Sequence, residues 1–181
     1  MLTPMRKLIT AAVWVALVAF VFFDIALIMG ALSPKQHTVS RSITIHKPAT
    51  QVWAVLTDYA GQPKWRDDLK SVDQLPPRGG LPLWRENYKN NMSDTLLTEQ
   101  SVTPIYLVRT IADEKSPVQG SWEFNIERNR DGSTTVKVTE HALVRGAFFR
   151  FMSRYVLRYS YIDKYLHQLA ARMGDSAARV S

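Results

Sequence analysis

The sequence contains no cysteine, which excludes disulfide bonds, thiolate metal sites and cysteine nucleophiles. Histidine is scarce as well, and none of the four histidines follows the HxxxH or HExxH spacing of a metal site. The chain also lacks internal repeats, low-complexity stretches, a phosphate-binding glycine loop and a serine–histidine–acid order. We therefore expect no metal and no cofactor.

Acidic residues are in deficit, with 16 Asp and Glu against 23 Lys and Arg, and the formal net charge is +7. A basic surface suits an anionic partner such as lipid headgroups or an acidic ligand. An excess of basic side chains is equally compatible with an ordinary solvated surface. We expect no nucleic-acid partner, because the excess is modest and the hydrophobic segment described next makes that partner awkward.

One long hydrophobic segment is present, at residues 8–32. A helix of this length extends ~37 Å, which is enough to span the hydrocarbon core of a bilayer. No charged residue occurs from Leu8 to Phe23. A cleaved signal peptide would have a shorter apolar region and an AxA-like cleavage site, so the pattern favours an uncleaved membrane anchor over residues 1–32.

The charges around this anchor leave its orientation open. Basic residues flank both ends: Arg6 and Lys7 before it, and Lys35, Arg41 and Lys47 after it. The positive-inside rule is therefore nearly balanced, and the usual outcome for an N-terminal anchor favours a domain outside the cytoplasm of a bacterial inner membrane. Asp24, inside the anchor, either reaches the interface near its far end or takes part in a helix–helix contact.

After a linker at residues 33–36, the chain shows the two-residue alternation of side chains that is typical of β-strands. Residues 37–45 alternate with a period of two, with Val39, Arg41, Ile43 and Ile45 on one face, which predicts a strand. Pro48 suits the entry to a short helix. Short turns between the later strands indicate an antiparallel meander. Those strands are predicted at 69–75, 83–90, 95–102, 105–111, 121–127 and 134–144, with a turn at 76–80.

A long amphipathic helix is predicted over Ala147 to Met173, because apolar residues recur at three and four positions. Gly174 ends it, and residues 175–181 are expected to form a flexible tail. This helix is long enough to cover one face of the sheet, so the fold class is α+β. Its basic residues Arg150, Arg154 and Arg158 form a stripe that either meets anionic headgroups or is simply solvated.

Several segments resemble the helix-grip superfamily of START-like and birch-pollen-allergen-like domains, also called SRPBCC. They are SITIHKPATQVWAVLTD at 42–58 followed by Trp65, GSWEF at 120–124, VKVTE at 136–140 and FFRF at 148–151. The last three segments are similar to bacterial members of the polyketide cyclase/dehydrase and lipid transport group. In the first segment, Lys47 stands where the superfamily often has Ala. The resemblance implies a domain at 37–174 in which a curved antiparallel sheet of about seven strands grips the long C-terminal helix around a cavity.

Three apolar strand faces each carry one charged residue: Glu86, Arg109 and Glu140. If these faces point inward, the three groups either fix the polar end of a ligand, or act in catalysis with a glutamate as base and Arg109 as oxyanion stabiliser. They could equally be a structural Arg–Glu pair, or lie outside if the register shifts. The predicted ligand-binding residues are Trp84, Glu86, Tyr88, Arg109, Trp122, Phe124, Glu140, Tyr155 and Tyr159.

These patterns predict a membrane-tethered domain that binds a lipid or another hydrophobic small molecule between the sheet and the last helix. Two alternatives stay open. One is an enzyme resembling a cyclase or dehydratase that acts on an apolar substrate, although we assign no catalytic residue. The other is a protein-interaction domain with a vestigial cavity, which large aromatic side chains filling the interior would favour.

Overall fold

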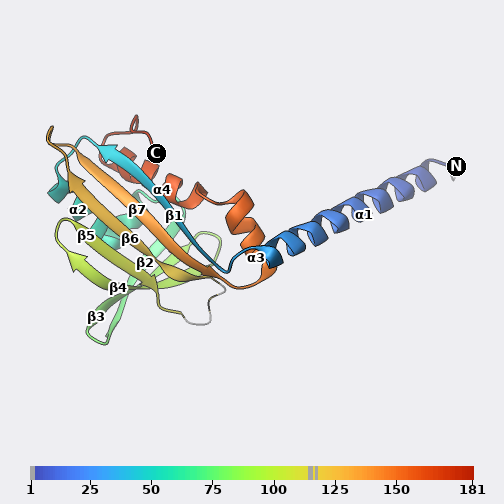
Figure 1. Ribbon diagram of the computed structural model, residues 1–181, viewed down its shortest axis with the longest axis horizontal. Helices are drawn as coiled ribbons and strands as arrows, with labels where there is room; N and C mark the ends of the chain where they lie inside the picture. Colours follow the sequence, from blue (N-terminus) through green and yellow to red (C-terminus); the bar gives the residue numbers. More distant parts are fainter. Residues whose placement is uncertain (1–2, 114–115, 117) are drawn as a thin grey trace. The chain divides into compact units, whose positions relative to one another are not determined.

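The structure is a computed structural model that describes residues 3–113, 116 and 118–181. It divides into two compact units, and each is described by itself (Figure 1). The first unit combines the N-terminal segment up to Lys35 with residues 144–157, and the second combines residues 36–143 with 158–181. The hydrophobic segment therefore shares a unit with residues from near the other end of the chain.

The first unit is built on the long helix α1 (Thr3–Leu32), which pairs with the short helix α3 (Ala147–Phe151). Within α1, the stretch Met5–Leu32 is long and apolar enough to cross a membrane and is a candidate membrane span. Helix α3 continues into a π-helical turn, η2 (Met152–Val156). This continuation places a second helical segment beside the C-terminal end of the candidate span.

Gly30 allows the close approach of α3 to α1. A Cβ atom added at Gly30 would collide with the carbonyl oxygen of Ala147, so only glycine leaves room for this packing. The guanidinium of Arg150 donates from Nε to the carbonyl oxygen of Gly30 at 2.7 Å, and the rings of Phe23 and Phe148 lie 5.7 Å apart. Arg150 is thus engaged with a backbone carbonyl near the end of α1.

The second unit contains a seven-stranded sheet in the order β1-β7-β6-β5-β4-β3-β2. The strands between β2 and β7 follow one another as a meander, as predicted, while β1 and β2 lie at opposite edges because helices connect them (Figure 1). The strands are β1 (Gln36–Ile45), β2 (Leu69–Arg78), β3 (Leu81–Tyr88), β4 (Ser93–Val102), β5 (Tyr106–Ile111), β6 (Val118–Arg128) and β7 (Thr134–Val144). Strand β2 runs on to Arg78, so its turn is confined to Gly79 and Gly80, both with positive φ.

Helix α4 (Ser160–Arg172) covers the sheet. Leu166 and Leu169 are fully buried in the same core as Val136 and Val138 of β7. Asp163 of α4 accepts a hydrogen bond from Arg41 of β1 at 2.8 Å. Between β1 and β2 the chain forms α2 (Ala49–Thr57) and the 3-10 helix η1 (Tyr59–Lys64). The α+β helix-grip architecture expected from the sequence is therefore confirmed.

The helix predicted over residues 147–173 is interrupted in the structure. Leu157 donates its backbone N–H to Met152, five residues back, and its φ of −109° and ψ of 11° take the chain out of the helix. The two halves belong to different units and pack against different partners: α3 against α1, and α4 against the sheet. Apolar spacing alone does not reveal a change of partner, which is why the pattern read as one stripe.

The C-terminal residues pair with the sheet in place of the expected loose tail. Val180 forms a β-bridge with Ile43, and the backbones of Ser181 and Ser42 exchange two hydrogen bonds of 2.9 Å. Gly174, with a φ of +80°, ends the helical segment as predicted, and this lets the chain turn back towards β1.

Candidate functional site: a buried arginine–glutamate cluster beside the cavity

A cavity lies between the sheet and α4 in the second unit. Its volume is about 410 Å³ when the open mouth is included, but the space that the centre of a water molecule can occupy is only ≈ 30 Å³. A space of this size holds one or two waters or a small polar group, so a larger ligand requires the aromatic side chains to turn. The cavity is lined by Arg66, Glu86, Leu96, Arg109, Trp122, Phe124, Val138, Tyr161, Ile162 and Tyr165.

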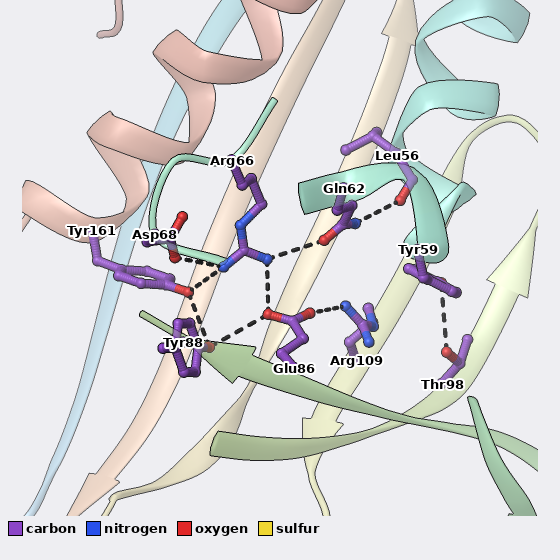
Figure 2. A network of polar contacts seen from close by, with 10 residues as sticks. All are labelled: Leu56, Tyr59, Gln62, Arg66, Asp68, Glu86, Tyr88, Thr98, Arg109 and Tyr161. Carbon is purple, nitrogen blue, oxygen red and sulfur yellow. Dashed lines mark hydrogen bonds and ion pairs between the residues drawn. The ribbon is translucent and has the colours of Figure 1, made fainter. Parts of the chain in front are cut away.

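Glu86 of β3 is the centre of a polar network at the wall of the cavity (Figure 2). Glu86 is 1% exposed, and its two carboxylate oxygens accept hydrogen bonds of 2.7 Å from Arg109 and from Arg66. Burial opposes ionisation, but the two guanidinium charges outweigh it and hold the pKa of Glu86 below its usual range. Glu86 is therefore an ionised counterion with both oxygens engaged, which makes it a poor general base.

Arg66 follows η1 and enters the network from the loop before β2. Its guanidinium donates to Glu86, to Gln62 at 3.0 Å, and to Asp68 and the hydroxyl of Tyr161, both at 2.9 Å (Figure 2). Gln62 is itself held by a hydrogen bond to the carbonyl oxygen of Leu56. This chain of contacts ties the first helices of the domain to α4 through a single buried cation.

Arg109 of β5 has fewer partners than Arg66, whose Nε alone is unpaired among the described residues. Nη1 of Arg109 donates to Glu86, and the planar group lies over the ring of Tyr59, 4.2 Å from its centroid. Nε and Nη2 are buried and find no hydrogen-bond partner among the residues that the structure describes. A buried, unsatisfied donor costs about 1–3 kcal/mol, and more on a charged group, so these N–H groups require an acceptor such as water or a ligand oxygen.

The structure brings together only part of the predicted ligand-binding set. Glu86, Arg109, Trp122 and Phe124 line the cavity. Tyr88 contributes a hydroxyl 3.4 Å from Glu86, and burial raises its pKa, so it stays a donor.

The other four predicted residues lie outside the cavity lining. Trp84 packs on Tyr59 with the ring centroids 5.2 Å apart, and Tyr159 lies against the guanidinium of Arg41. Tyr155 belongs to the first unit and is 51% exposed. Their role in ligand binding stays a prediction.

Glu140 of β7 contacts Trp122, which lines the cavity, but is not itself among the lining residues. It accepts a hydrogen bond from Nε1 of Trp122 at 3.3 Å, and Nε2 of His37 lies 3.9 Å away. Burial raises the pKa of Glu140, and the indole N–H and the imidazole offset this only in part. Of the two predicted carboxylates, Glu86 and Glu140, Glu140 therefore changes its protonation state more easily.

Sequence reasoning missed Arg66, Gln62, Tyr161 and Tyr165. Arg66 lies in a loop, where no repeating pattern shows which side chains are buried. Its position next to Trp65, which follows the segment that resembles the superfamily, was a usable signal. Tyr161 and Tyr165 are four apart on α4 and lie one position before Ile162 and Leu166 of the predicted apolar stripe, so the pattern did not mark them. The hydroxyl of Tyr161 reaches Arg66, and the ring of Tyr165 lies under the guanidinium of Arg66, because α4 lies over the cavity.

An antiparallel sheet closed by a C-terminal helix over a cavity defines the helix-grip class, and comparison with known proteins agrees. The chain belongs to the polyketide cyclase/dehydrase and lipid transport family, whose model matches residues 36–174. The resemblance read from the sequence is thereby confirmed. A search of the curated proteins gave no significant match.

Solved structures share this fold at low sequence identity. A START superfamily protein from Mycobacterium smegmatis is 16% identical with a TM-score of 0.61, and the match covers 76% of this chain and 97% of that one. The Zhui aromatase/cyclase from Streptomyces sp. R1128 is 16% identical with a TM-score of 0.62 over 78% of this chain and 96% of that one. A conserved protein from Geobacillus kaustophilus is 14% identical, with a TM-score of 0.63 and coverage of 80% and 99%. At such identities the likeness establishes the fold alone.

Proposed function

We propose that this protein is a membrane-tethered binding domain for an amphipathic, lipid-like small molecule. The polar end of the ligand accepts hydrogen bonds from Nε and Nη2 of Arg109, and its apolar part lies against Trp122 and Phe124. The observation that carries the proposal is the buried guanidinium of Arg109, which lines the cavity with two donors unpaired among the described residues. Carboxylate, phosphate and carbonyl oxygens are the acceptors that suit it.

Entry of such a ligand requires movement at the mouth of the cavity. The rings of Trp122 and Tyr161 lie 6.0 Å apart, and Tyr161 is 41% exposed although its hydroxyl bonds to Arg66. We propose that these two rings separate to admit the ligand, because the closed space is too small for a lipid chain. The candidate span α1 supports a lipid-like ligand, since a tethered domain stays close to its lipid source.

An enzyme resembling a cyclase or dehydratase is the second candidate, and Glu140 favours it. Its raised pKa suits a general acid or base, and its hydrogen bond to Trp122 connects it to the cavity wall. Turnover would then depend on Glu140 and not on Glu86, whose oxygens are already occupied by arginines. Loss of turnover of an apolar polyketone in Glu140→Gln, with retained binding, would favour the enzyme.

The binding proposal is tested on the full-length protein, extracted in mild detergent and examined by native mass spectrometry with lipid extraction. Arg109→Lys keeps a positive charge beside Glu86 but removes the two unpaired donors. We expect co-purified ligand in the wild type and a loss of roughly tenfold or more in occupancy in this variant, as for a hydrogen bond to a charged group.

Arg41→Lys is the matched control, because Arg41 also pairs with a carboxylate, that of Asp163, but does so away from the cavity. It should retain the ligand. A wild-type protein that carries no small molecule, or equal occupancy in both lysine variants, would overturn the assignment of Arg109.

A further inference from the structure

The segment that breaks the C-terminal helix exposes apolar side chains to an unusual extent. Phe148 is 38% exposed, Phe149 is 50%, Tyr155 is 51% and Val156 is 54%. All four lie within α3 and η2, and none belongs to the core of the second unit. Exposed aromatic and aliphatic groups gathered in so short a segment mark an interaction surface.

The charge of this segment is of one sign. Between residues 145 and 157 the sequence contains Arg145, Arg150 and Arg154 and no acidic residue. Arg154 is exposed and lies near the ring of Tyr155, while Arg150 is held by the carbonyl oxygen of Gly30. Apolar side chains interleaved with arginine fit an anionic lipid surface, which offers an apolar layer beneath its phosphates.

The same unit places this segment at the end of the candidate span. Helix α3 packs on the C-terminal part of α1, where Phe23 meets Phe148 and Gly30 meets Ala147 (Figure 1). The span Met5–Leu32 is 28 residues long, whereas about 20 residues cross the hydrocarbon core. The span is therefore about eight residues longer than the hydrocarbon core requires, and its C-terminal turns carry α3.

We propose that residues 147–156, formed by α3 and η2, are a second membrane contact that lies in the headgroup region of the bilayer entered by α1. Phe149 and Val156 are both at least half exposed, so their side chains are available to the acyl boundary. Arg154 faces the phosphates of anionic lipids. The contact goes beyond ligand binding, because it would exist whether or not the cavity is occupied.

The absence of cysteine makes a direct test simple. Single cysteines are introduced as Phe149→Cys and Val156→Cys in the full chain, labelled with the fluorophore NBD, and reconstituted into phosphatidylcholine vesicles with or without phosphatidylglycerol. Lys137→Cys, exposed on β7, is the matched control. We expect brominated phospholipids to quench the labels at 149 and 156 by roughly twofold, with little effect at 137.

Two results would overturn the proposal. The labels at 149 and 156 could be as water-exposed and as weakly quenched as the label at 137. Alternatively, they could be shielded from water equally in vesicles and in detergent micelles but not quenched by brominated lipid, which would assign the surface to a protein contact, such as a second copy.

The contribution of charge is tested separately with Arg154→Gln. The control is Arg172→Gln, because Arg172 is also an exposed arginine but lies at the end of α4. Phosphatidylglycerol should increase the quenching at position 149 in the wild type and in Arg172→Gln. We expect a smaller increase in Arg154→Gln, because one basic group near the surface is lost. The same increase in all three proteins would contradict the assignment of Arg154 to the lipid phosphates.

Discussion

The carboxylate of Glu86 and the guanidinium of Arg109 are joined by a hydrogen bond of 2.7 Å although their strands are not neighbours. Strand β4 lies between β3 and β5, so the two side chains meet above it, over the side of the sheet that faces the cavity (Figure 2). Arg66 closes the network from a loop. Two buried guanidiniums from different parts of the chain therefore depend on one carboxylate.

Glu86→Gln should destabilise the domain by about 3–5 kcal/mol, because the two buried guanidiniums lose their shared counterion. Thermal unfolding of the detergent-solubilised protein, followed by near-ultraviolet circular dichroism, measures the change. Glu99→Gln is the control, since Glu99 is exposed on β4, and it should change stability by less than about 0.5 kcal/mol. Equal stability of the two variants would show that the network does not hold the fold together.

Glu86 also makes stability depend on pH in the acid range. Because the two arginines hold the pKa of Glu86 below its ordinary value of 4.5, its contribution is complete above that value and is lost as the pH falls through the folded-state pKa. The wild type should therefore lose stability in acid more steeply than Glu86→Gln. Unfolding midpoints measured between neutral and strongly acidic pH give the two slopes, and parallel slopes would contradict the assignment.

Glu140→Gln should stabilise the protein near neutral pH. Burial raises the pKa of Glu140 above its ordinary 4.5, so its contribution to stability is complete below that value and is lost as the pH rises through the folded-state pKa. Glutamine keeps an acceptor for the indole of Trp122 without a charge. We expect a higher unfolding midpoint than the wild type at pH 7 and a smaller difference at pH 4, and no such pattern in Glu127→Gln, an exposed position on β6.

Leu166→Ala should cost about 2–5 kcal/mol, because the side chain of Leu166 is fully buried between α4 and the sheet. His167→Ala, one position along the same helix but exposed, should change stability by less than about 0.5 kcal/mol. The comparison is made by urea unfolding. A small effect at Leu166 would mean that α4 does not cover the core.

Gly30→Val should separate α3 from α1, because a side chain at this position collides with the backbone of Ala147. The packing is read out by cysteines introduced at Phe23 and Phe148, whose rings lie 5.7 Å apart, and joined by a short bis-maleimide. We expect efficient cross-linking that Gly30→Val greatly reduces. Ala31→Val is the control substitution, since Ala31 is exposed one position along the same helix, and it should leave cross-linking unchanged.

The sequence by itself determined the elements whose pattern is local. Alternation marked Thr134–Val144 with the bounds that the structure shows, because one face of that strand is buried and the other is not. Hydropathy alone marked α1 as a candidate span. Strand period also predicted that Glu86, Arg109 and Glu140 each share a strand face with apolar residues, although not whether that face points inward.

Tertiary structure alone decided which of these groups meet and which do not. Glu86 and Arg109 share a face but pair only because β3, β4 and β5 are adjacent, and Arg66 joins them from a loop that has no period to read. The break at Leu157 was hidden for a related reason. An apolar stripe records that a helix buries one side, but the partner that covers it is set by contacts far apart in the sequence.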